Sequence, residues 1–231
     1  MKKIILIETS TALCSVALAE DGAVTAYRES SAAKAHASLT AVFVQEVLQE
    51  RGLKLEDCDA VCVSKGPGSY TGLRVGVSTA KGLCFGMQKP LLAVGTLDIL
   101  VAQAKEETKA PEGGFKYVIP MIDARRMEVY SAIFTPEGQQ LTETVPVIVD
   151  ESSFAEYLEQ GPVLFIGDGA GKCANIIKHP NAHFAQCYPK ASSMLSPATE
   201  ALKTEKFQDV AYFEPFYLKE FVATVSKKKL F

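Results

Sequence analysis

The sequence lacks any apolar run of the roughly 18 to 20 residues that a membrane-spanning helix requires. It also lacks an excess of basic residues, because 24 Lys and Arg stand against 27 Asp and Glu and give a formal net charge of −3. Broad binding of nucleic-acid phosphates by this chain alone is therefore disfavoured, since each neutralised phosphate needs a Lys or Arg. We expect a cytoplasmic protein without membrane contact, in which any contact with RNA needs a partner.

Histidine is scarce, and cysteine forms no ligand pairs. The three histidines, His36, His179 and His183, have no Glu or Cys at ligand spacing and no neighbouring nucleophile elbow. The six cysteines include no Cys-x-x-Cys pair and sit mostly in apolar segments, which predicts reduced, buried thiols. The sequence therefore predicts no metal site, no catalytic triad and no cofactor held by this chain alone.

Apolar residues make up 48% of the 231 residues, which is enough for one large core or two small lobes. Apolar periodicity predicts the following elements in the first half: strands at 3–8, 14–19 and 23–28, a helix at 39–50, a strand at 60–63, a helix at 70–85, a strand at 91–94 and a helix at 96–107. We predict a first lobe at 1–107, followed by a polar joint at 108–116.

The second half begins again with a hairpin. Its predicted elements are strands at 117–122 and 128–134, a third strand through Val149, a helix at 152–159, a strand at 163–166 and a helix at 169–177. The later helices are short, and residues 180–196 look irregular. We therefore predict an α/β protein whose second lobe, 117–231, is an eroded version of the first.

Glu8, Thr9 and Ser10 follow the first predicted strand. A carboxylate and two hydroxyls at such a turn could meet a phosphate or a metal. The alternative is that they hydrogen-bond the turn itself, as Ser and Thr often do. The sequence favours this structural role, because no glycine stands close by in Ala12-Leu13.

The run from Gly66 to Gly76, Gly-Pro-Gly-Ser-Tyr-Thr-Gly-Leu-Arg-Val-Gly, is the most distinctive in the chain. Glycines before a helix can gather N–H groups around an anion, but the spacing is not that of a P-loop. Gly68, Gly72 and Gly76 instead recur along one helix face, and each interior glycine costs roughly 1 kcal/mol relative to alanine. We expect a compensating contact, and favour a helix–helix interface.

Gly167, Asp168 and Gly169 end one predicted strand and open a helix. They could contact a nucleotide, or they could serve a tight strand-to-helix turn, and the sequence leaves both alternatives open. The charged stretch from Asp123 to Arg126 could be a catalytic pair, but a solvated hairpin tip is the more common case.

These motifs together resemble the TsaB (YeaZ) family, the partner of the threonylcarbamoyl transferase TsaD in bacterial tRNA modification. The resemblance rests on Ile7-Glu8-Thr9-Ser10, His36-Ala37-Ser38, the glycine-rich run from Gly66 to Arg74, and the stretch from Ile122 to Tyr130. It implies an actin-like, sugar-kinase-like fold of two ribonuclease-H-like lobes. The catalytic relative carries a His-x-x-x-His metal pair, and the matching positions here are Thr96 and Leu100.

The resemblance implies a non-catalytic subunit that forms a heterodimer with TsaD, is joined by the ATPase TsaE, and meets tRNA through the complex. Alone, the same surface could form a homodimer, and ATP or ADP could bind at the interface of the complex. The helices at 39–49 and 70–85 would form that interface. Its expected residues are Leu39, Val42, Phe43, Gly68, Tyr70, Gly72, Leu73, Arg74, Gly76, Thr79 and Ala80. The alternative is an enzyme of the same superfamily, a small-molecule kinase or a metallopeptidase.

Overall fold

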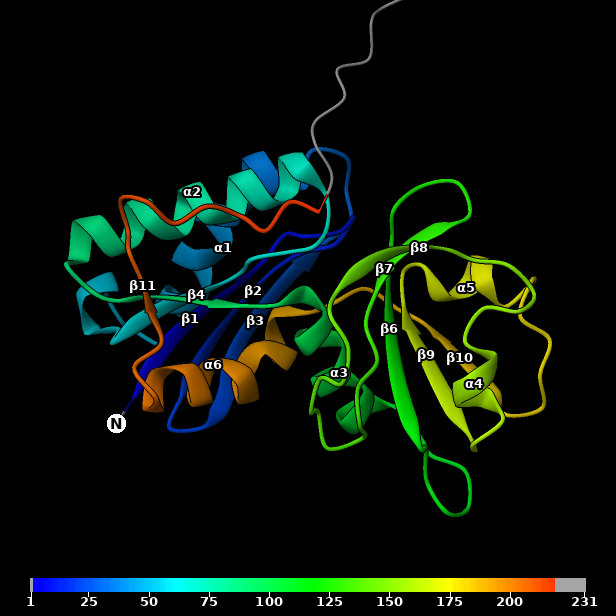
Figure 1. Cartoon of the computed structure of the whole chain (residues 1–231). Coiled ribbons are helices and arrows are strands. Elements are labelled where there is room, and N and C mark those ends of the chain that lie inside the picture. Colours follow the sequence, from blue (N-terminus) through cyan, green and yellow to red (C-terminus); the bar gives the residue numbers. More distant parts are fainter. Residues whose placement is uncertain (1, 219–231) are drawn as a thin grey trace, which may run out of the picture.

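Two mixed β-sheets, each covered by helices, organise residues 2–218, the part of the chain that the computed structural model describes (Figure 1). The first sheet has the order β11-β5-β4-β1-β2-β3. Its strands are β1 (Lys3–Glu8), β2 (Cys14–Glu20), β3 (Ala23–Ser30), β4 (Ala60–Ser64), β5 (Leu91–Val94) and β11 (Phe207–Gln208). β1 pairs antiparallel with β2, and β2 pairs antiparallel with β3, so the predicted opening meander is confirmed. β1 also pairs in parallel with β4.

Alternation along the strands sends apolar side chains to both faces of this sheet. Ile5 and Ile7 face α1 (Ala35–Glu50) and α2 (Tyr70–Met87), which lie side by side on one face (Figure 1). Ile4 and Leu6 face the opposite side, which is covered by the short 3₁₀ helix η2 (Ala191–Met194) and by α6 (Leu195–Lys203). Another 3₁₀ turn, η1 (Leu55–Asp57), precedes β4. The first sheet is therefore buried on both faces.

The second sheet has the order β10-β9-β6-β7-β8. Its strands are β6 (Tyr117–Asp123), β7 (Glu128–Ser131), β8 (Val145–Ile148), β9 (Val163–Gly167) and β10 (Ala182–Gln186). One face packs against α4 (Ala155–Leu158) and α5 (Ala170–Cys173) through a cluster that includes Phe165. Both helices are shorter than predicted, which agrees with an eroded second lobe.

Helix α3 (Thr96–Glu107) lies between the two sheets (Figure 1). Ile99 belongs to the core on the first sheet, whereas Leu97, Leu100 and Val101 belong to the core on the second. One helix thus contributes to both lobes.

The prediction of two ribonuclease-H-like lobes in an actin-like, sugar-kinase-like fold is confirmed. Two details of the second half are wrong. β10 lies in the stretch 180–196 that we expected to be irregular. Residues 191–208 do not belong to the second lobe, because η2, α6 and β11 return to the first sheet. Residues 219–231, the end of the predicted second lobe, lie outside the described residues. No helix within residues 2–218 is long and apolar enough to cross a membrane.

Candidate functional site

Glu8 ends β1 with its side chain fully buried. One carboxylate oxygen accepts a hydrogen bond from the backbone N–H of Ser10, and the N–H of Thr9 donates to the hydroxyl of Ser64. Burial raises the pKa of the Glu8 carboxyl to about 7, against the lowering effect of these polar neighbours. One oxygen of Glu8 thus bonds the turn, whereas its other oxygen and the hydroxyls of Thr9 and Ser10 are buried without a hydrogen-bond partner among residues 2–218. The structural role that the sequence favours for these three residues stays a prediction.

Asp168 follows β9 on the second lobe and is close enough to Glu8 to raise the pKa of that carboxyl further. One oxygen of Asp168 accepts a hydrogen bond of 2.9 Å from the backbone N–H of Asp123, and burial raises the pKa of Asp168 to about 6. Two carboxyl groups from different lobes thus lie within electrostatic range of each other, and both favour the protonated form more than an exposed acid does.

The charged hairpin tip is fixed by one lysine. The ammonium group of Lys172 on α5 donates to the Asp123 carboxylate at 2.6 Å and to the carbonyl oxygens of Arg126 and Glu128 at 2.8 and 2.7 Å.

Glycine is needed at the neighbouring turn, because Gly167 has a φ of +129° and the carbonyl of Met121 fills the space of a Cβ atom. The geometry of Gly167 and Gly169 is thus set by packing on β6.

The glycine face of α2 packs inside the chain, which corrects the predicted interface. A Cβ atom on Gly68 would collide with the backbone of Ser10, and one on Gly72 or Gly76 would collide with Thr9. The backbone N–H of Ser69 also donates to the carbonyl of Ser10 at 2.6 Å. The compensating contact that these glycines need is the turn between β1 and β2 of the same molecule.

Several other predicted interface residues are also core residues. Phe43, Leu73 and Ala80 are buried, and Leu39, Tyr70 and Thr79 are half-buried. Of the predicted set, Val42 and Arg74 are exposed. Arg74 stacks on the ring of Tyr70 and donates to the hydroxyl of Tyr217, so part of it is already engaged.

Part of the outward face of α1 and α2 is formed by Val42 together with positions outside the predicted set, and these residues carry small, apolar or uncharged side chains. We call this face the helix-pair surface. Its residues are Ala41, Val42, Gln45, Val75, Ser78, Gly82 and Phe85. Phe85 is 81% exposed, and a Cβ atom on Gly82 would meet nothing within 4 Å. Gly82 and Phe85 were not among the predicted interface residues, although neither belongs to the buried stripe of α2 that includes Val77, Ala80 and Cys84.

The C-terminal segment 209–217 runs along α2 and borders the helix-pair surface (Figure 1). The ammonium group of Lys81 donates to the carbonyl oxygens of Ala211 and Phe213, each at 3.0 Å. Val210 and Phe213 pack against the core below α2. Between this segment and α2 lies an apolar groove whose lining includes Gly82, Phe85, Val210 and Ala211.

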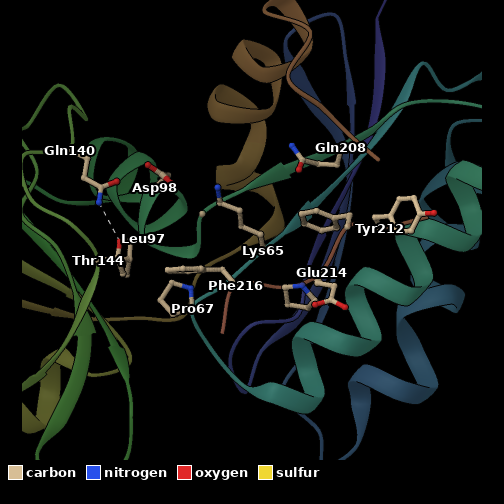
Figure 2. Close-up of a pocket in the computed structure, with 14 residues that line it drawn as sticks. Lys65, Pro67, Leu97, Asp98, Gln140, Thr144, Gln208, Tyr212, Glu214 and Phe216 are labelled. Carbon is tan, nitrogen blue, oxygen red and sulfur yellow. Dashed lines mark hydrogen bonds between the residues drawn. The ribbon is translucent and has the colours of Figure 1, made fainter. Parts of the chain in front are cut away.

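A separate cavity of about 560 Å³ lies where the C-terminal segment passes between the lobes (Figure 2). Lys65, Pro67 and Asp98 come from the first lobe, Gln140 and Thr144 come from the second, and Phe216 comes from the C-terminal segment. Within residues 2–218 there is no group of three or more His, Cys, Asp or Glu side chains placed to hold a metal ion.

Comparison with known proteins gives one consistent family. The family described as "TsaD: tRNA N6-adenosine threonylcarbamoyltransferase" matches residues 29–227. The tRNA threonylcarbamoyladenosine biosynthesis protein TsaB of Escherichia coli (strain K12) is 30% identical over 231 residues, which covers 96% of each chain. The tRNA N6-adenosine threonylcarbamoyltransferase of Symbiobacterium thermophilum is 46% identical over 66 residues, 29% of this chain and 19% of the enzyme. The solved structure of YeaZ from Pseudomonas aeruginosa matches with a TM-score of 0.82 and 28% identity, covering 94% of this chain and 100% of that one.

Proposed function

Because the chain belongs to the TsaB (YeaZ) family of tRNA threonylcarbamoyladenosine biosynthesis proteins, we propose that it is a non-catalytic subunit that binds its catalytic relative, TsaD, through the helix-pair surface. The likeness to TsaB proteins runs along the whole chain, whereas the likeness to the transferase of Symbiobacterium thermophilum covers 66 residues. Two related proteins that share one lobe design are suited to pair through equivalent surfaces.

The exposed ring of Phe85 is the observation that carries this proposal. Phe85 is 81% exposed and Val42 is 41% exposed, on two adjacent helices. The other residues of the helix-pair surface carry no charge, although Arg74 is also exposed on α2. An aromatic ring in water beside small residues is typical of the centre of a protein interface. The exposed glycines Gly82 and Gly86 add support, because the folded chain gives them no contact that offsets their cost within the helix.

The positions that match the histidine pair of the catalytic relative support a non-catalytic role. Thr96 begins α3 and is fully buried, and Leu100 lies in the core between α3 and the second sheet. Neither side chain offers an imidazole, which is the transition-metal ligand that this pair supplies.

The rest of the assembly follows from the same proposal. In the cytoplasm, TsaE joins the heterodimer, tRNA is met through the complex, and ATP or ADP binds at its interface. Without TsaD, the helix-pair surface pairs with a second copy of the chain. The acidic net charge of −3 agrees with a subunit that leaves most RNA contacts to its partners.

The test is the affinity of the full chain for TsaD, measured by calorimetry. Phe85→Ser and Val42→Ser should each weaken binding by about tenfold or more, because both remove apolar contact area from the centre of the interface. Ile148→Ser is the matched control, since Ile148 is 76% exposed but lies on β8 of the other lobe. Unchanged affinity in the first two variants would contradict the proposed surface.

The second candidate function is a small-molecule kinase or metallopeptidase. The polar turns between the lobes motivate it, but the fully buried Glu8 and the hydrogen bonds that occupy Asp168 and Asp123 give it less support. Tight binding of ATP or a divalent metal by the isolated chain, seen by calorimetry, would favour this function over the first.

A further inference from the structure

The exposed side chain of Lys65 lines the cavity at the joint between the lobes. The backbone of Lys65 is held on both sides, because its N–H donates to the carbonyl of Val94 at 2.9 Å and its carbonyl accepts from the N–H of Phe216 at 2.7 Å. The side chain then projects into the cavity (Figure 2). Among residues 2–218 its ammonium group has no hydrogen bond or ion pair.

Flat apolar surface lies next to this ammonium group. The ring of Phe216 is 44% exposed, and it lies beside Pro67 and the Lys65 side chain in Figure 2. Phe213 from the same C-terminal segment also lines the cavity. An exposed aromatic face beside an unpaired cation is suited to a ligand that has both a flat ring and an anionic group.

The other charges limit how much negative charge the ligand can carry. Asp98 and Glu214 also line the cavity, so two carboxyl groups oppose one ammonium group. Asp98 is close enough to Lys65 for the lysine to lower its pKa, although burial has the larger and opposite effect. Asp98 and Glu214 repel any anion, and this repulsion is about twice as large for a phosphate with two charges as for a single carboxylate, whose one charge Lys65 can neutralise.

The second lobe supplies neutral hydrogen-bonding groups. The amide nitrogen of Gln140 donates to the carbonyl of Thr142 and to the hydroxyl of Thr144, so its amide oxygen is held in place as an acceptor. Gln208 adds another amide from the opposite wall. Such groups fix the orientation of a bound ring without adding charge.

From these contacts we propose that the cavity binds a small aromatic monocarboxylate, with the carboxylate on Lys65 and the ring against Phe216 and Pro67. This inference does not depend on the proposed function, because the cavity lies apart from the helix-pair surface. A bound ligand would touch both lobes and the C-terminal segment at once.

The experiment uses the full chain and 1-naphthoate as the probe, followed by NMR chemical-shift titration. We expect saturable shifts confined to the cavity residues, while cyclohexanecarboxylate, which lacks a flat ring, and 1-naphthalenemethanol, which lacks the charge, bind at least tenfold more weakly. Adenosine 5′-monophosphate and inorganic phosphate should also bind at least tenfold more weakly, because of Asp98 and Glu214. Equal or tighter binding of either phosphate would overturn the proposed ligand class.

Two lysine variants separate the site from general charge effects. Lys65→Met should weaken naphthoate binding at least tenfold, and Lys65→Arg should keep most of it. Lys54→Met is the matched control, because Lys54 is exposed but does not line the cavity. No saturable shift with wild-type protein, or equal binding by Lys65→Met and Lys54→Met, would overturn the proposal.

Discussion

The carbonyl oxygen of Thr9 occupies the space that a Cβ atom on Gly72 would need. This contact fastens the start of α2 to the turn that follows β1. A Cβ atom on Gly82, further along the same helix, would meet no atom within 4 Å. Two glycines in one helix therefore serve different purposes, and substitution distinguishes them.

Alanine substitution at these two glycines should change stability in opposite directions. Gly72→Ala should destabilise the chain by roughly 1–3 kcal/mol, because the new methyl group forces backbone against backbone in a packed site. Gly82→Ala should stabilise it by about 1 kcal/mol, because alanine is the better helix former and meets no neighbour. Urea denaturation measures both free energies of unfolding. Equal effects of the two substitutions would show that Gly72 is not packed as described.

Stability should also fall with rising pH because of Glu8. The folded state holds the pKa of this carboxyl near 7, above the unfolded value of 4.5, so the folded state binds the proton more tightly. Below pH 4.5 both states are protonated and there is no penalty. Between about pH 4.5 and 7 the unfolded state ionises first, and the penalty grows to about 3 kcal/mol. Asp168, with a folded pKa of about 6, acts in the same direction.

Glu8→Gln isolates this effect, because glutamine can still accept the hydrogen bond from Ser10 but cannot ionise. Between pH 4.5 and 8, the free energy of unfolding of the variant should fall by about 3 kcal/mol less than that of the wild type. Urea midpoints at both pH values, with wild type and variant side by side, provide the measurement. Parallel pH profiles for the two proteins would mean that Glu8 does not titrate in this range.

Lys81 should control the position of the C-terminal segment beside the helix-pair surface. Lys81→Met keeps most of the aliphatic stem but removes the two hydrogen bonds to Ala211 and Phe213, a loss of about 1 kcal/mol at this partly exposed site. Amide hydrogen exchange in residues 209–217 should then accelerate about fivefold. Lys89→Met is the control, because Lys89 does not bond this segment in the described structure. The same exchange rates in both variants would show that apolar packing alone holds the segment.

Most regular elements within residues 1–107 could be predicted because they carry a strong periodic pattern, although α1 begins at Ala35 and not at Leu39. β1, α2 and α3 begin within a residue or so of their predicted positions. β10 was missed because Ala182–Gln186 is only half-buried and mixes polar with apolar residues, so no alternation marks it. The return of α6 and β11 to the first sheet depends on partners far away in the chain, which no local pattern records.

The candidate site was predicted less well for a related reason. The spacing of Gly68, Gly72 and Gly76 correctly indicates that something approaches the helix closely, but it does not identify what. The neighbour is Thr9 and Ser10 of the same chain, and this became visible when β1 and α2 were placed together. Exposure of Phe85 likewise depends on which face of α2 meets the sheet.

The position of α3 limits how this molecule can be divided. Its side chains fill parts of two cores, and residues 191–208 cross back to the first sheet. A fragment ending at residue 107 would lack η2 and α6 and leave one face of the first sheet exposed. A fragment starting at residue 117 would lack α3 and leave an apolar face of the second sheet exposed. Neither half should fold stably when it is expressed alone. An exchange of lobes between relatives should require that α3 and α6 are transferred together with the elements against which they pack.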